Sequence, residues 1–182
     1  MKLKQVVDYG MDLTGKAAKL SAALMGGGFF AHALFYLVIR PFPQCGMAEK
    51  ILCMVLPLVI YGAWLIMLRV IPVELSRVYG VLAACACLLL AIQGFFVTGG
   101  FGAAMGLVWY IICAAAYIFI SFGFLPYRLL LGPMMLVPAA IRAISLLANL
   151  TSKDYGDCVY EASGLLVLLA IGCLSSILYR RK

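Results

Sequence analysis

Residues 51–68 read ILCMVLPLVIYGAWLIML and contain no charged side chain. Eighteen residues at 1.5 Å per residue form a helix of about 27 Å, close to the ~30 Å hydrocarbon core of a bilayer. Similar apolar runs follow one another from Ala17 onward, separated by short polar segments. The 182 residues are 66% hydrophobic and 12% charged, whereas about 25% of the residues in a soluble domain are charged. The sequence therefore predicts an all-α, polytopic integral membrane helix bundle.

The apolar runs predict about six transmembrane helices within a single domain that covers residues 17–182. The expected spans are residues 17–39, 51–68, 73–97, 106–125, 129–150 and 160–179. Residues 1–16 carry apolar side chains at helical spacing opposite a charged face, which predicts an amphipathic interfacial leader. A solvated, frayed leader fits the pattern equally well. Residues 31–33 (AHA) are similar to a signal-peptide cleavage site, but the apolar run continues beyond them, so we expect a retained first helix.

The basic residues are distributed unequally between the two sides of a six-span topology. Of the 14 Lys and Arg residues, Arg142 lies inside a span, and three fall on one side: Arg40, Lys50 and Lys153. The remaining ten fall on the other: Lys2, Lys4, Lys16, Lys19, Arg69, Arg77, Arg128, Arg180, Arg181 and Lys182. Lys and Arg are enriched in cytoplasmic loops, so we expect a multi-pass plasma-membrane protein with both termini in the cytoplasm. Cations that flank apolar runs favour the lipid bilayer as a partner and argue against nucleic acid.

Small residues recur every four positions in two of the predicted spans. The two sets are Ala23, Gly27 and Ala31 in the first span, and Ala83, Cys87 and Ala91 in the third. Small side chains at this spacing let helix backbones approach closely, which drives helix association in lipid. Both sets therefore predict helix packing, either within one molecule or with other membrane proteins or a second copy.

The histidine of the chain, His32, follows three consecutive glycines, Gly26, Gly27 and Gly28. Glycine destabilises a helix by about 1 kcal/mol per residue, so the triplet predicts either a flexible point or a close approach of another helix. In the first interpretation His32 is a candidate ligand-binding residue that takes up a proton or an anion. In the second, the glycines pack against a neighbouring helix and His32 bonds to it.

The fifth span carries a polar stripe. Arg142, Ser145 and Asn149 share one helix face, which Ser152 extends, and Pro138 precedes Arg142 by one turn. An arginine within the bilayer is unfavourable by about 2.5–3.5 kcal/mol and usually faces the bundle interior. Its expected partner is Glu161, across the short loop to the sixth span. Arg142, Ser145, Asn149 and Glu161 are therefore candidate ligand-binding residues, and snorkelling of Arg142 to the headgroups is the alternative.

The seven cysteines give no sign of a metal site, since no CxxC pair occurs. Cys45 and Cys158 fall in loops that the topology places on the same outer side, so a disulfide between them is possible. We find no catalytic constellation and no cofactor motif, and we expect a protein that is not an enzyme. An enzyme acting on lipid ranks last, because the chain offers no nucleophile–base pair.

Two functions remain. The size and span count are compatible with the small substrate-binding membrane subunits of multi-component importers, an analogy of size alone, and this favours a small-molecule transport subunit. The alternative is a non-catalytic scaffold or assembly partner of other membrane proteins. A cavity at Arg142 or His32 would favour the first, and a closed bundle with an exposed face of small residues the second.

The charge asymmetry gives a testable topology. In a variant without other accessible cysteines, Lys153→Cys should react with a membrane-impermeant maleimide applied to intact cells, whereas Lys182→Cys should react only after the cells are opened. Reaction of Lys182→Cys from outside intact cells would contradict the cytoplasmic C-terminus.

Overall fold

The computed structural model describes residues 3–40, 46–70, 76–97, 100–122 and 131–178, and within these ranges the regular secondary structure is helical. The first two helical segments each contain a π-helical stretch. The elements are α1 (Leu3–Leu34), η1 (Phe35–Ile39), α2 (Met47–Glu49), η3 (Lys50–Val55), α3 (Leu56–Val70), α4 (Ser76–Val97), α5 (Gly100–Ser121), α6 (Leu131–Ser152) and α7 (Tyr155–Leu178). Because η1 continues α1, and because α2, η3 and α3 are contiguous, the described residues form six long helical segments, as expected.

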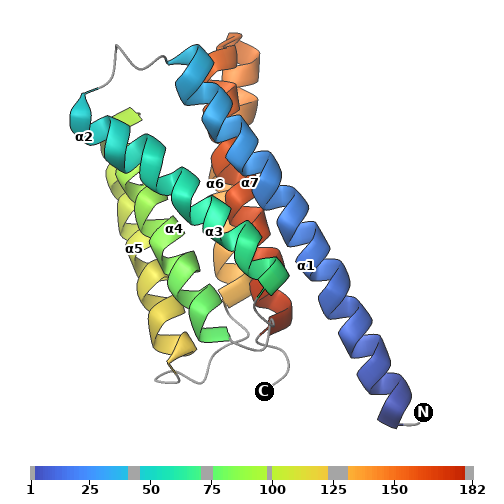
Figure 1. The fold of residues 1–182 in the computed structure, drawn as a ribbon. Coiled ribbons are helices and arrows are strands. Elements are labelled where there is room, and N and C mark those ends of the chain that lie inside the picture. Colours follow the sequence, from blue (N-terminus) through green and yellow to red (C-terminus); the bar gives the residue numbers. More distant parts are fainter. Residues whose placement is uncertain (1–2, 41–45, 71–75, 98–99, 123–130, 179–182) are drawn as a thin grey trace.

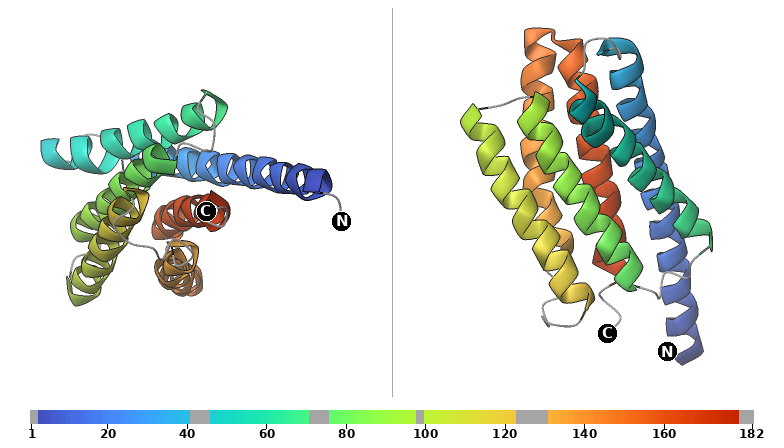
Figure 2. Two further views of the ribbon diagram at one scale, coloured as in Figure 1. Left: turned by 90° about the horizontal axis from the view of Figure 1, so that it is seen from below. Right: turned by 60° about the vertical axis from the view of Figure 1, so that its left-hand side comes forward.

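The helices pack as a bundle in which α7 contacts helices from both ends of the chain. Helix α7 packs along α1 and α6, α4 pairs with α5, and α3 contacts both α1 and α4 (Figures 1 and 2). The first and last helices are therefore neighbours. The start of α1 and the end of α7 lie at the same end of the bundle (Figure 1), as an even number of crossings requires.

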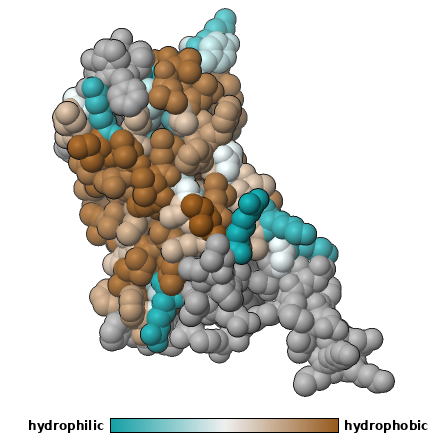
Figure 3. All heavy atoms as spheres, viewed as in Figure 1, coloured by the Kyte–Doolittle hydropathy of each residue, from teal (hydrophilic) through white to brown (hydrophobic). Residues whose placement is uncertain are grey.

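The helices have the length and composition of membrane spans. Five described stretches are long and apolar enough to cross a bilayer: Gly15–Ile39, Met47–Arg69, Arg77–Gly94, Met134–Ser152 and Tyr155–Ser175. The apolar stretch Gly106–Ser121 of α5 is shorter. Hydrophobic residues cover most of the described surface in Figure 3, and Leu136, Ile144 and Leu147 of α6 are each more than 60% exposed. Exposed apolar side chains of this size are suited to lipid, and the prediction of an all-α polytopic membrane bundle is confirmed.

The observed helix bounds differ from the expected ones mainly at polar ends. The second segment begins at Met47 and α7 at Tyr155, several residues before the expected starts at 51 and 160. Asp154 explains the early start of α7, because its Oδ1 accepts a hydrogen bond of 3.3 Å from the backbone N–H of Asp157. The predicted amphipathic leader, residues 1–16, is continuous with the first span from Leu3 onward, because α1 is one helix from Leu3 to Leu34, and its N-terminal end projects beyond the bundle (Figure 1). Its position at a membrane interface stays a prediction.

The glycine triplet of α1 is a packing surface. A Cβ at Gly28 would lie 2.8 Å from Cγ2 of Val167 and 3.3 Å from the carbonyl oxygen of Ser163, both on α7. The hydroxyl of Ser163 also donates to the Gly28 carbonyl at 3.3 Å. Gly27 faces Leu166 at 3.3 Å, whereas nothing lies within 4 Å of a Cβ at Gly26. The close-packing interpretation therefore describes Gly27 and Gly28, and not Gly26.

The two sets of small residues occupy different surroundings. Ala83, Cys87 and Ala91 are buried in the main apolar core, which they share with residues of α3, α5, α6 and α7. In the first set, Gly27 packs on α7, Ala31 is half-buried and Ala23 is exposed. The set in α4 thus packs within the molecule, while Ala23 lies at its surface.

The two neighbouring glycines provide a matched test of α1 packing. Gly28→Ala should lower the free energy of unfolding by about 1–3 kcal/mol, because the new methyl group overpacks the contact with α7. Gly26→Ala meets open space and should be neutral or stabilising by up to about 1 kcal/mol. Thermal unfolding of both variants in detergent measures the difference. Equal effects would mean that α1 does not approach α7 through Gly28.

Candidate functional site: a buried polar centre

The charged pair expected between the fifth and sixth spans lies inside the bundle. Nη1 of Arg142 on α6 is 2.8 Å from Oε2 of Glu161 on α7, and each side chain is 8% exposed. Arg142 is ten residues from the end of α6 at Ser152, about 15 Å along the helix and half the thickness of the hydrocarbon core. Arg142 therefore points into the protein and does not snorkel.

The remaining donors of Arg142 face two tyrosines. Nε donates to the hydroxyl of Tyr110 on α5 at 3.3 Å, and Nη2 donates to that of Tyr160 on α7 at 3.5 Å. The guanidinium carbon also lies 4.9 Å from the centroid of the Tyr160 ring, within cation–π range. A Cβ at Gly164 would be 3.1 Å from Nε, so the absence of a side chain there makes room for the guanidinium group. Helices α5, α6 and α7 together enclose the charge.

His32 occupies a neighbouring buried position between α1 and the second helical segment. Its ring is 1% exposed and faces the backbone carbonyls of Cys53 and Met54 in η3. The ring centroids of Tyr36 and Tyr61 lie 5.0 Å and 5.7 Å from it. His32 is thus held in an aromatic environment made by η1 and α3.

A proline follows the π-helical stretch of the second helical segment. Pro57 has no N–H, so it cannot make the bond to the carbonyl of Cys53 that a residue four positions later makes in a regular α-helix. Nε2 of Gln93 on α4 donates to this carbonyl at 2.8 Å. The helix is π-helical over Lys50–Val55, which ends two residues before the proline, and π-helical turns are frequent at functional sites.

Three buried polar atoms in this region have no hydrogen-bond partner among the described residues: Nε2 of His32 and the hydroxyl oxygens of Tyr36 and Tyr61. The ring of Phe35 lies 5.0 Å from that of Tyr36 and 5.3 Å from that of Tyr160, between centroids, and so connects the two groups. We therefore treat one set of residues as a single buried cluster, the polar centre, which consists of His32, Tyr36, Tyr61, Tyr110, Arg142, Tyr160 and Glu161.

The other candidate residues of the polar stripe do not join the polar centre. Ser145 and Asn149 are half-buried further along α6, and the exposed Ser152 donates to the carbonyl of Asn149 at 3.1 Å. Arg142 is thus the member of the stripe that belongs to the polar centre. Cys45 of the possible disulfide lies outside the described residues, so its pairing with Cys158 stays a prediction. Within the described ranges, no three His, Cys, Asp or Glu side chains are grouped as metal ligands.

The tyrosines and Gln93 were missed from the sequence. Each of them interrupts an apolar run, and a polar side chain within a span needs a partner inside the protein. That rule marks Tyr36, Tyr61, Tyr110 and Gln93 as residues to examine. It does not indicate which helices they face, because this depends on how the bundle is assembled.

Comparison of the chain with protein-family models, with curated proteins and with solved structures found no match in any of the three. The function must therefore be inferred from the fold and the polar centre. They define a helical integral membrane protein with an ion pair buried among its helices.

The ion pair should be energetically coupled. Arg142→Gln and Glu161→Gln should each lower the free energy of unfolding by about 3–5 kcal/mol, because each leaves an unpaired buried charge. The double variant should lose much less than the sum. Thermal unfolding in detergent gives the three values, and additive effects within about 0.5 kcal/mol would show that the pair does not contribute.

A second ion pair serves as the control. Nη2 of Arg40 lies 3.3 Å from Oε1 of Glu49, and the arginine side chain is 33% exposed. The same cycle at Arg40 and Glu49 should give a smaller coupling than at Arg142 and Glu161, since water reaches the Arg40 side chain although Glu49 is only 11% exposed.

Proposed function

We propose that this integral membrane protein is a small-molecule transport subunit that binds its substrate at the polar centre. The observation that carries the proposal is the group of unpartnered polar atoms on His32, Tyr36 and Tyr61. A buried donor or acceptor without a partner destabilises a protein by about 1–3 kcal/mol. Three such atoms within one aromatic cluster are well explained if a bound polar molecule completes their hydrogen bonds.

The neighbouring charges support a route to the polar centre from one end of the bundle. Tyr36 lies within electrostatic range of Glu49 and Arg40, which form the ion pair between the ends of the first two helical segments. From Tyr36, ring contacts extend to His32 and Tyr61. A second set of contacts extends through Phe35 to Tyr160, which lies beside Arg142. The described side chains close around Arg142, so substrate entry requires the helices to separate near η1 and η3.

The chemistry of the polar centre favours a particular class of substrate. The charges of Arg142 and Glu161 neutralise each other, and the unpartnered atoms belong to tyrosine hydroxyls and an imidazole. Aromatic walls with a few polar groups suit small organic ligands. We expect a small solute that is uncharged or zwitterionic, has hydrogen-bonding groups and presents a flat face for stacking.

The second candidate function is a non-catalytic assembly partner. The closed packing around Arg142 favours it, because a fully paired and enclosed ion pair is also typical of a structural element. In this case the unpartnered atoms would have no ligand, and other membrane proteins would bind the exposed apolar faces. Copurification in mild detergent distinguishes a partner complex from a subunit that binds a solute.

Two tyrosines give the deciding comparison. Tyr61→Phe removes a hydroxyl for which the described part of the chain offers no partner, so it should raise the free energy of unfolding by about 1 kcal/mol. Tyr117→Phe removes a hydroxyl that lies 2.9 Å from Oγ of Ser175, so it should lower this free energy by about 1 kcal/mol. Under the transport proposal, a compound that stabilises the wild type should lose this effect in Tyr61→Phe and keep it in Tyr117→Phe.

The measurement is thermal unfolding in detergent with a panel of amino acids, nucleobases and water-soluble vitamins at millimolar concentration. A compound that stabilises wild type and Tyr61→Phe equally does not bind at the polar centre. If no compound in the panel stabilises the wild type while a membrane protein copurifies with it, the assembly-partner function is the better account.

A further inference from the structure

A groove lies between α1 and α3, at the end of the bundle where α1 begins. It has a volume of about 470 Å³ and is lined by Ala18, Lys19, Ala22, Leu65, Ile66, Leu68 and Arg69. Five of the seven lining residues are apolar and two are cationic. The groove is separate from the polar centre and shares no residue with it.

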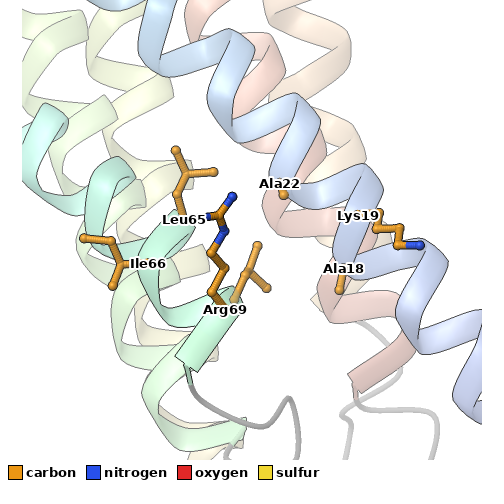
Figure 4. A pocket seen from close by; sticks show the side chains of 7 residues that line it. Ala18, Lys19, Ala22, Leu65, Ile66 and Arg69 are labelled. Carbon is orange, nitrogen blue, oxygen red and sulfur yellow. The ribbon is translucent and has the colours of Figure 1, made fainter.

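The two cationic residues, Lys19 and Arg69, lie at the edge of the groove. Arg69 directs its guanidinium group into the space between the two helices, whereas Lys19 lies on α1 with its ammonium group turned away from α3 (Figure 4). Both residues are exposed. The small side chains of Ala18 and Ala22 form the α1 wall, and their size is what leaves the groove open.

Both cations lie at the depth of the lipid headgroups. Lys19 is 20 residues before Ile39, the end of the first span, which is about 30 Å along a helix. Arg69 is the last residue of the candidate span that begins at Met47. The groove therefore has cationic residues at the headgroup level and apolar walls that extend into the hydrocarbon. A phospholipid has the same arrangement, with a charged headgroup followed by apolar chains.

Hydrogen bonds close the groove toward the interior of the protein. Nε1 of Trp64 on α3 donates to Oγ of Ser21 on α1 at 3.1 Å, and Ser21 donates to the carbonyl of Ala170 on α7 at 2.9 Å. Trp64 and Ser21 are next to the lining residues Leu65 and Ala22 in the sequence. This connection holds α1, α3 and α7 together behind the groove, so a molecule bound there remains at the lipid-facing surface.

We propose that the groove binds an anionic phospholipid of the leaflet at this end of the bundle. The phosphate pairs with the Arg69 guanidinium group, Lys19 adds positive charge nearby, and one acyl chain lies along Ala18, Ala22 and Leu65. Charge complementarity selects this occupant, since anionic lipids attract Lys and Arg by about 1 kcal/mol per residue near the membrane surface. The proposal does not depend on transport, because no residue of the polar centre takes part.

The test compares lipids and variants by thermal unfolding and native mass spectrometry of the whole chain in detergent. Phosphatidylglycerol should stabilise the wild type and remain bound to it, whereas phosphatidylcholine at the same concentration should do so much more weakly. Glycerol 1-phosphate tests for a site that needs only the phosphate, and it should have no effect because it lacks acyl chains.

Three variants locate the site. Arg69→Gln should weaken the apparent affinity for phosphatidylglycerol by about fivefold, and Lys19→Gln by less, because its ammonium group points away from the groove. Arg77→Gln removes an exposed cation at the start of α4, outside the groove, and should leave the affinity unchanged. Ala22→Leu fills the groove without changing charge and should also reduce binding.

Equal binding of the two lipids by the wild type would overturn the proposal. An effect of Arg77→Gln as large as that of Arg69→Gln would also overturn it, because a general attraction to a cationic surface would then be sufficient. If Arg69→Gln does not fold, Ala22→Leu and the lipid comparison on the wild type still decide the question. If glycerol 1-phosphate alone stabilises the protein, the groove is a simple anion site and not a lipid site.

Discussion

A polar group inside the hydrocarbon of a bilayer has no water to bond, so the protein itself must supply its partner. The interior of this bundle is organised by that constraint. Arg142 is surrounded by Glu161, Tyr110 and Tyr160, and Ser21 links α1 to both α3 and α7. Each of these interactions joins different helices, so the polar groups also determine which helices lie side by side.

Close packing of the helices adds to the contacts that the polar groups make between them. Helix α1 approaches α7 closely at Gly28, and Gly164 of α7 leaves room for the guanidinium group of Arg142. At both positions the absence of a side chain permits the close approach. Gly28 allows contact with α7, and Gly164 allows contact with Arg142 of α6. Without a hydrophobic drive between helices in lipid, close contacts of this kind and interhelical hydrogen bonds supply the association energy. The side chains of α7 are accordingly among the most deeply buried of the described residues.

The sequence allows the helix class, the number of long helices and the partner of Arg142 to be predicted, because each follows from local pattern or from neighbours in the chain. Apolar run length gives the spans, and Glu161 is the acid across a short loop from Arg142. The link from Gln93 to the Cys53 carbonyl and the grouping of His32 with Tyr61 depend on contacts between separate helices. Helical spacing predicted that Arg142, Ser145 and Asn149 share a face, but the neighbouring helices decide which part of that face is enclosed. The groove beside Arg69 likewise results from the way two helices pack, which residue spacing along either of them does not specify.

The proline in the second helical segment has a consequence for the biosynthesis of the protein. Pro57 has no N–H to donate to the carbonyl of Cys53, and this carbonyl accepts from Gln93, which is made 40 residues later. A chain synthesised from its N-terminus therefore delivers this segment to the membrane before Gln93 exists. Arg142 likewise precedes Glu161 by 19 residues. These two contacts between helices thus form only after the later helix of each pair has been made, and any factor that assists their assembly would act in the interval that these two separations define.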